Sequence, residues 1–269
     1  MPNALTIAGS DSGGGAGIQA DLKTFAALGV FGTSAITSVT AQNTVGVQGV
    51  HDLPPEFVGR QIDSVLEDIG IDAAKTGMLS NAAIIEVVAT TVKAHAIRRL
   101  VVDPVMVAKG GASLLQPDAV KTLITRLLPL ALVVTPNVPE AEVLWGQAIA
   151  GFAEMHEAAR WIHDLGPRYV VVKGGHLGIR AIDLVYDGST FTMLDAERID
   201  TPHTHGTGCV FSAAITAELA KGSPVPEAIA TAKRFITAAI SHGFQLGKGF
   251  GPTDPMAAAR VLTPHDPEP

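Results

Sequence analysis

Short apolar runs alternate along the chain with longer segments in which apolar residues recur every three or four positions. The short runs are rich in β-branched residues and predict buried strands at residues 4–8, 33–40, 71–76, 100–103, 132–135 and 169–173. The longer segments predict helices at residues 16–28, 54–69, 81–95, 117–128, 152–165, 208–221 and 225–242, and one further helix starts near residue 136. Strands at 181–186 and 190–194 predict a hairpin, and a Gly/Pro-rich tail follows the last helix.

Strands that alternate with helices predict an α/β fold with a central, mostly parallel sheet flanked by helices. Such sheets bind ligands at the carboxyl ends of their strands. Polar or flexible residues follow the predicted strands in that sense, namely residues 9–11, Gln42, Met78, Asp103, Asn137, Glu140 and Lys173. We therefore expect these residues to gather along one edge of the sheet, beside residues 206–209.

The composition agrees with one large domain. No break in composition and no linker divides the 269 residues, so we predict a single domain over residues 1–269. Hydrophobic residues make up 47% and charged residues 17%, which is enough for a sizeable core. The net charge of −7, without a Lys/Arg cluster, argues against nucleic acid and anionic membrane surfaces as partners. No signal peptide or membrane-spanning run is recognisable, so we expect a cytoplasmic protein.

The stretch from Asp200 to Ala214 contains the strongest candidate for chemistry. Glycines at the start of a predicted helix leave backbone N–H groups approachable, and these groups bind anions. Cys209 lies in the first turn, where we expect its thiol to lose a proton easily and to act as a base or nucleophile. The alternative is a glycine-capped helix whose lone Cys is a small buried hydrophobe.

The glycine-rich loop at residues 9–15 does not match the known nucleotide-binding motifs. A G-x-G-x-x-G beginning at Gly13 would need glycine where Ile18 stands, and Lys23 does not follow a glycine as a Walker A motif requires. The loop is therefore either a turn near a ligand or merely a tight turn.

Two carboxylates and one lysine follow predicted strands. Asp103 and Glu140 together suit Mg²⁺, which takes a few protein oxygens with phosphates and waters; singly, each is also explained as a turn or helix-capping residue. Lys173 ends an apolar strand before two glycines, which favours a phosphate contact. The spacing of His203, His205 and Cys209 matches no usual zinc pattern, so we expect the histidines to shape their loop instead.

The whole set of motifs carries a resemblance. Residues 200–209 resemble the signature of the hydroxymethylpyrimidine/phosphomethylpyrimidine kinases, thiamin-biosynthesis enzymes of the ribokinase-like family. Further similar stretches lie at residues 8–21, 38–44, 75–78, 103–106, 135–137 with Glu140, and 172–176. The resemblance covers residues 4 to about 252 and implies a ribokinase-like three-layer fold.

The resemblance also implies a role for each site residue. The pyrimidine would be held by Gln42, Gly9, Asp21, Met78 and the backbone at Val105. Asp103 and Glu140 would serve Mg²⁺, and Lys173 would contact an ATP phosphate. The anion hole and the base would come from Gly206, Thr207, Gly208 and Cys209. Lys109 would belong to a mobile lid at residues 105–113, although Gly110, Gly111 and Ala112 depart there from the family pattern, as does the tail around Asp254.

These implications lead to an expected function. We expect a kinase that uses ATP and Mg²⁺ to phosphorylate 4-amino-5-hydroxymethyl-2-methylpyrimidine and then its monophosphate, and that forms a homodimer. A pyridoxal kinase of the same fold is the first alternative, and a non-catalytic protein that binds a vitamin precursor is the second. The intact Cys209, Glu140 and glycines argue against the second alternative, since a pure binder has no need of an anion hole.

Overall fold

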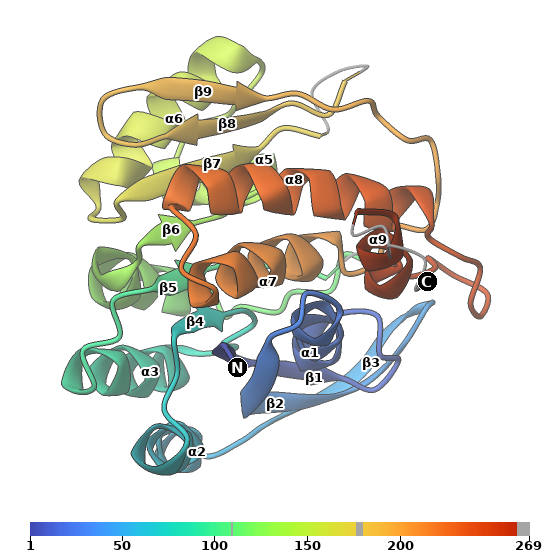
Figure 1. The fold of residues 1–269 in the computed structure, drawn as a ribbon. Helices are drawn as coiled ribbons and strands as arrows, with labels where there is room; N and C mark the ends of the chain where they lie inside the picture. The colour runs from blue at the N-terminus through green and yellow to red at the C-terminus, as the bar shows by residue number, and fades with distance from the viewer. Residues whose placement is uncertain (109, 176–179, 263–269) are drawn as a thin grey trace.

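Nine strands form one sheet in the computed structural model, which describes residues 1–108, 110–175 and 180–262 (Figure 1). In chain order they are β1 (Asn3–Asp11), β2 (Phe31–Asn43), β3 (Gly46–Asp52), β4 (Ala73–Thr76), β5 (Leu100–Val102), β6 (Val133–Val134), β7 (Tyr169–Lys173), β8 (Asp183–Tyr186) and β9 (Phe191–Leu194). Their order across the sheet is β3-β2-β1-β4-β5-β6-β7-β8-β9. The six adjacent strands β2, β1, β4, β5, β6 and β7 run parallel to one another. The strand β3 runs antiparallel to β2, β8 to β7, and β9 to β8. This arrangement confirms the mostly parallel sheet and the predicted hairpin.

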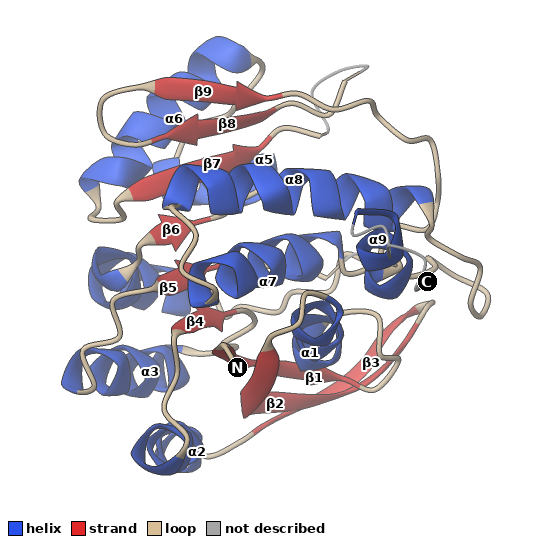
Figure 2. Cartoon of the chain, viewed as in Figure 1, coloured by secondary structure: helices blue, strands red, loops and turns tan. Residues whose placement is uncertain are grey.

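Helices cover both faces of the sheet (Figure 2). One face carries α1 (Gly17–Ala27), α7 (Thr207–Ala220), α8 (Val225–Ser241) and α9 (Pro255–Leu262). The other carries α2 (Pro55–Asp68), α3 (Ala82–Ala94), α4 (Ala119–Thr122), η1 (Leu123–Leu127), η2 (Leu128–Leu130), α5 (Val138–Trp145) and α6 (Phe152–Asp164). Side chains alternate between the two cores along each strand: Val171 packs with Phe211 on the α7 side, while Val170 and Val172 pack on the side of α6.

The predicted helix at residues 117–128 is wrong as a single α-helix. It breaks into α4, a π-helical turn (η1) and a 3₁₀ turn (η2). The irregular winding keeps Leu123, Leu127 and Leu128 in the core. Pro129 lies inside η2 and lacks the N–H group that a continuing α-helix needs, and the segment ends at Leu130.

Two elements escaped the sequence prediction. The strand β3 pairs with β2, but most of its side chains are exposed and show no alternating pattern. The helix α9 starts at Pro255 inside the expected tail, and the Asp254 carboxylate accepts the N–H groups of Met256 and Ala257. This arrangement, an acidic cap followed by proline in the first turn, was a readable helix signal.

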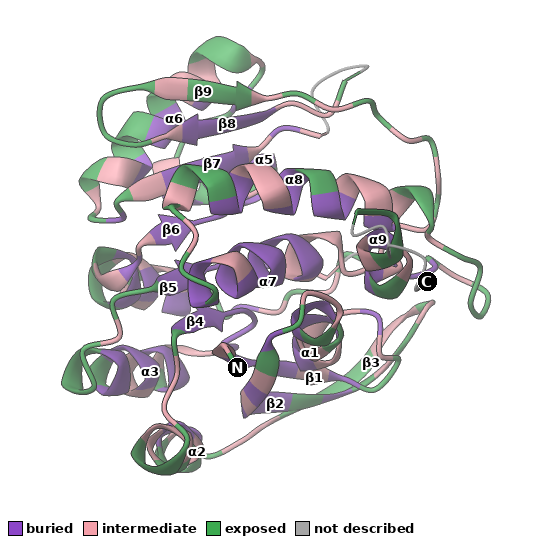
Figure 3. Cartoon of the chain, in the orientation of Figure 1, coloured by how far each residue is buried: buried purple, intermediate pink, exposed green. Residues whose placement is uncertain are grey.

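The helix α7 is the most buried helix of the fold, as Figure 3 shows. It packs against the sheet, α1 and α8. Small residues such as Ala213, Ala214 and Ala217 allow this close packing, and all three are fully buried. The start of α7 therefore has a fixed position at the carboxyl ends of the strands. None of the helices in the described part of the chain is long and apolar enough to span a membrane.

Candidate active site

A cavity of about 760 Å³ lies at the carboxyl ends of the parallel strands, next to the start of α7. It is lined by nearly all the site residues predicted from the sequence: Gly9, Gln42, Met78, Asp103, Val105, Glu140, Lys173, Gly206, Thr207, Gly208 and Cys209. Ile236 and Ile240 of α8 and residues 197–201 line its far end. Lys109 lies outside the described residues, so its lid role and the mobility of residues 105–113 stay predictions.

Gly9, Gln42 and Met78 form one end of the cavity. A side chain at Gly9 would place its Cβ 2.7 Å from the Met78 methyl carbon, so the glycine leaves the space that the Met78 methyl group occupies against β1. The Thr37 hydroxyl donates to the Met78 carbonyl at 2.7 Å and fixes that residue. Gln42 sits where the pairing of β2 and β3 shifts its register, and its side-chain oxygen accepts a bond from Thr40 at 3.1 Å.

Asp21 differs from its expected role as a direct substrate contact. Its side chain is fully buried and does not line the cavity. One carboxylate oxygen binds the Lys75 ammonium at 2.8 Å and the other accepts the Thr6 hydroxyl at 2.6 Å. Lys75 itself lines the cavity, so Asp21 supports the cavity floor through Lys75.

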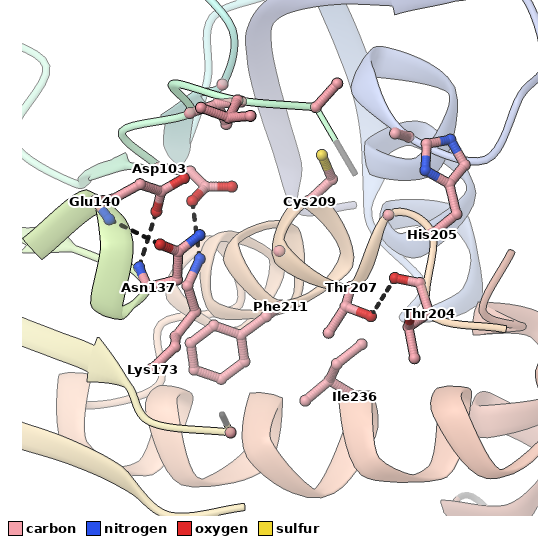
Figure 4. A pocket seen from close by; sticks show the side chains of 18 of the residues that line it. Asp103, Asn137, Glu140, Lys173, Thr204, His205, Thr207, Cys209, Phe211 and Ile236 are labelled. Carbon is pink, nitrogen blue, oxygen red and sulfur yellow. Dashed lines mark hydrogen bonds and ion pairs between the residues drawn. The ribbon is translucent and has the colours of Figure 1, made fainter. Parts of the chain in front are cut away.

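Asp103, Glu140 and Lys173 meet on one side of the start of α7 (Figure 4). The Lys173 ammonium lies 3.2 Å from one Asp103 oxygen, and the Ser212 hydroxyl donates to the other at 3.2 Å. Glu140 accepts the Asn137 N–H at 2.8 Å in a capping box that starts α5. Glu140 therefore both caps the start of α5 and lies in the same cavity as Asp103.

The electrostatics of this cluster leave room for a cation. Burial raises the pKa of Glu140 to about 7, although the Lys173 ammonium opposes this shift. Burial by itself lowers the pKa of Lys173, but the carboxylates of Asp103 and Glu140 outweigh it and hold that pKa above its ordinary value. Two carboxylates thus share one ammonium. Within the described ranges no group of three or more His, Cys, Asp or Glu side chains could bind a metal.

The start of α7 is built from glycines for steric reasons. Gly206 caps the helix with φ +79°, and a Cβ there would lie 1.9 Å from the carbonyl oxygen of Gly15. The N–H groups of Gly208 and Cys209 belong to the first helical turn, where no intrahelical partner exists. The Thr207 N–H, in the same turn, lies 3.4 Å from the Thr204 carbonyl oxygen. A Cβ at Gly208 would lie 3.4 Å from the Lys173 ammonium, so these N–H groups and Lys173 border the same space.

The expected easy ionisation of Cys209 is wrong for the ligand-free protein. Burial raises the pKa of the Cys209 thiol to about 12, and the nearby Lys75 ammonium only partly opposes this effect. The sulfur also accepts the backbone N–H of Gly17. Desolvation therefore outweighs the favourable position at a helix start.

Sequence reasoning missed two buried polar pairs at the cavity. The Asp11 carboxylate lies 3.0 Å from His205 Nε2. At the far end, Lys233 binds Asp183 at 2.8 Å, and Asp183 also accepts the N–H of Gly174 at 3.1 Å. Lys233 interrupts the apolar face of α8, and a lysine in such a position signals a buried anionic partner.

The fold and cavity define the class of protein as a kinase of ribokinase-like fold, in which the glycine-rich start of a helix faces a lysine and two carboxylates. Comparisons with known proteins give the family. A model described as phosphomethylpyrimidine kinase matches residues 11–254. The hydroxymethylpyrimidine/phosphomethylpyrimidine kinase of Haemophilus influenzae is 54% identical over 263 residues, which cover 96% of this chain and 97% of that protein. The chain therefore belongs to the phosphomethylpyrimidine kinase family.

Two solved structures are also similar. An ADP complex of Bacillus subtilis pyridoxal kinase has a TM-score of 0.90 and 48% identity, covering 98% of this chain and 100% of that one. The phosphomethylpyrimidine kinase of Clostridium difficile has a TM-score of 0.80 and 45% identity, covering 89% and 100%. The fold is thus shared by proteins named pyridoxal kinase and phosphomethylpyrimidine kinase.

Proposed function

We propose that this protein transfers a phosphoryl group from ATP to 4-amino-5-hydroxymethyl-2-methylpyrimidine, and then a second one to the resulting monophosphate. The observation that carries the proposal is the single cavity in which Gln42 and Met78, the start of α7, and the cluster of Asp103, Glu140 and Lys173 meet. Relatives that are 51–55% identical in sequence are named hydroxymethylpyrimidine/phosphomethylpyrimidine kinases, and these names support the pyrimidine as acceptor.

Gln42 would select the acceptor. Its primary amide offers an oxygen acceptor and an N–H donor side by side. The 4-amino group and ring nitrogen of the pyrimidine present the matching donor and acceptor. Met78, held against Gly9, would supply an apolar surface beside the ring.

The opposite side of the cavity would hold the phosphates. The N–H groups at residues 207–209 and the Lys173 ammonium offset negative charge on the transferring group. The far end, with Ile236 and Ile240, has the apolar character that a nucleotide base requires, and the ADP complex of a structural relative supports ATP as the donor.

Asp103 and Glu140 fit a Mg²⁺ site. Buried Glu140 has a raised pKa and no ammonium of its own, and a cation beside it would favour the ionised carboxylate. Two protein carboxylates, completed by phosphates and waters, are the usual Mg²⁺ environment. When bound, the ion would neutralise charge on the phosphate oxygens.

Cys209 is the proposed proton acceptor for the first transfer. The alcohol must lose a proton, whereas the monophosphate is mostly a dianion near pH 7.5 because its second pKa is about 6. Since the thiol is protonated in the ligand-free protein, this role requires that the thiol first release its proton to solvent as the substrates bind. We predict that Cys209→Ala lowers kcat for the free pyrimidine by roughly 10²–10⁴, and much less for the monophosphate. Equal losses on both acceptors, at saturating ATP and Mg²⁺, would mean that Cys209 only shapes the loop.

A coupled assay of ADP release tests the function. The acceptors are the free pyrimidine, its monophosphate and pyridoxal, with acceptor-free protein as the blank. We expect the highest kcat/KM with the pyrimidines. Pyridoxal kinase activity is the second candidate function, favoured by relatives of that name at 48–49% identity. A higher kcat/KM for pyridoxal would select that candidate instead.

We also propose that the protein acts as a homodimer. The strand β3 is an edge strand, and Val50 on it and Val39 on β2 are exposed. Sheet edges of this kind are usually covered. Sedimentation equilibrium measures the mass directly, and a mass of one chain at micromolar concentration would reject the dimer.

A further inference from the structure

Two loops far apart in the sequence interlock beside the cavity. The first, residues 11–17, runs from the last residue of β1 to the first residue of α1 and lies next to the acceptor end. The second, residues 203–208, includes the first residues of α7. They are joined by the bond between Asp11 Oδ2 and His205 Nε2, at 3.0 Å, and both side chains are largely buried, with 3% and 12% exposed. Within the active-site region this pair links the acceptor side directly to the start of α7.

Each partner is itself fixed by the backbone of its own surroundings. Asp11 accepts the N–H groups of Gly13, Gly15 and Ala16 at 2.8–3.0 Å. Burial alone would raise the pKa of Asp11, but the His205 bond and these N–H groups bring it below the ordinary value, so the carboxylate stays charged. His205 donates its backbone N–H to the Gly251 carbonyl and accepts from Thr253, which ties it to the segment before α9.

The backbones of the two loops are in close contact around this bond. A Cβ at Gly15 would lie 2.4 Å from the His205 ring, and one at Gly206 would lie 1.9 Å from the Gly15 oxygen. The Gly17 N–H, at the end of the first loop, reaches the Cys209 sulfur. A shift of either loop therefore moves the other.

We infer that His205 is a positioning residue, whose bond to Asp11 sets the distance between the bound acceptor and the anion-binding start of α7. The acceptor end belongs to β1 and its neighbours, whereas the N–H groups that would bind the oxygens of the transferring phosphoryl group belong to α7. The rate of transfer depends steeply on this distance, since a misplacement of 1 Å can cost about 10²-fold. The inference rests on the proposed kinase function.

Two substitutions of His205 test the inference in the full-length protein. His205→Leu keeps a side chain of similar bulk but removes the donor. His205→Gln offers an N–H donor near the place of Nε2. We expect His205→Leu to lower kcat for the free pyrimidine by about 10²-fold, with KM for the pyrimidine and for ATP changed less than about threefold. We expect His205→Gln to recover most of that kcat.

His203→Gln is the matched control. This residue lies in the same loop, outside the cavity lining, and its buried Nδ1 has no hydrogen-bond partner among the described residues. We expect its kcat to stay near the wild-type value. Should His205→Leu fold poorly, Asp11→Asn breaks the bond from the other side, and the double variant should lose no more kcat than the worse single variant, because the two residues act as one unit.

The outcomes separate the two proposals. A wild-type protein that phosphorylates none of the three acceptors would refute the proposed function. An active wild type with an unchanged kcat in folded His205→Leu would refute the positioning role alone. Equal losses in His205→Leu and His205→Gln would refute it as well, because the bond would then not be what matters.

Discussion

Cys209 shows how burial and a helix start compete at one residue. The partial positive charge at the start of α7 favours the thiolate, and so does Lys75. Removal of the thiol from water costs more, and the pKa rises to about 12. The position along the helix was visible in the sequence, but the depth of burial was not, because it results from the packing of Gly17 and α7 together.

The raised pKa predicts slow alkylation of Cys209. Below its pKa the thiolate fraction grows tenfold with each pH unit, so reaction with iodoacetamide should accelerate steadily from pH 7 to pH 10 without levelling off. At pH 8 the rate should be about 100-fold below that of free cysteine, because the higher nucleophilicity of the thiolate offsets only part of its scarcity. The protein has one cysteine, so mass spectrometry follows the reaction directly. A rate that levels off near pH 8 would contradict the raised pKa.

Substitutions at Glu140 and Asn137 should affect Mg²⁺ binding and stability separately. Glu140→Gln keeps an oxygen that can accept the Asn137 N–H, so the start of α5 should survive while the charge is lost. We expect the Mg²⁺ concentration for half-maximal rate to rise at least tenfold, with little change in Tm. Asn137→Ala is the control: it should lower the free energy of unfolding by about 1 kcal/mol and leave the Mg²⁺ requirement alone. The reverse pattern would reduce Glu140 to a capping residue.

At the scale of elements, the glycine at position 208 lowers the stability of the start of α7 but leaves its backbone N–H groups accessible from the cavity. A Cβ at Gly208 meets Lys173 and Asp103 only at 3.4 and 3.6 Å, so Gly208→Ala should fit and raise the free energy of unfolding by up to about 1 kcal/mol. The new methyl group would occupy the space beside the N–H groups, and we expect kcat to fall roughly 10²-fold. Gly206→Ala should instead destabilise the protein, since its φ is +79°. Urea unfolding and ADP release measure both, and an active Gly208→Ala would remove the N–H groups from the mechanism.

The elements that the sequence predicted well are those with a strong apolar period. The strand β7 matches its predicted bounds, and α8 begins where predicted. The prediction failed where tertiary contacts override local pattern. The strand β3 is held by pairing with β2 rather than by burial. The irregular turns after α4 keep the side chains of Leu123, Leu127 and Leu128 buried in the core. The burial of Asp21 with Lys75 was not predictable for a similar reason, since Lys75 is 54 residues away.

At the scale of the whole molecule, the layers are joined by buried ion pairs as well as by apolar packing. Lys233 on α8 reaches across to Asp183 on β8 at 2.8 Å. Lys233→Met leaves the carboxylate buried without its counter-charge and should lower the free energy of unfolding by about 3–5 kcal/mol. The double variant with Asp183→Asn, which keeps an acceptor for the Gly174 N–H, should recover part of that loss. Chemical denaturation checks both, and a double variant less stable than Lys233→Met would contradict the ion-pair account.

The bond between Asp11 and His205 joins residues 194 positions apart in the chain. A ribosome makes the acceptor side first and adds the start of α7 only when most of the protein has already emerged. Any shortened product that ends before His205 therefore lacks one partner of this bond and the residues 206–209 that line the same side of the cavity.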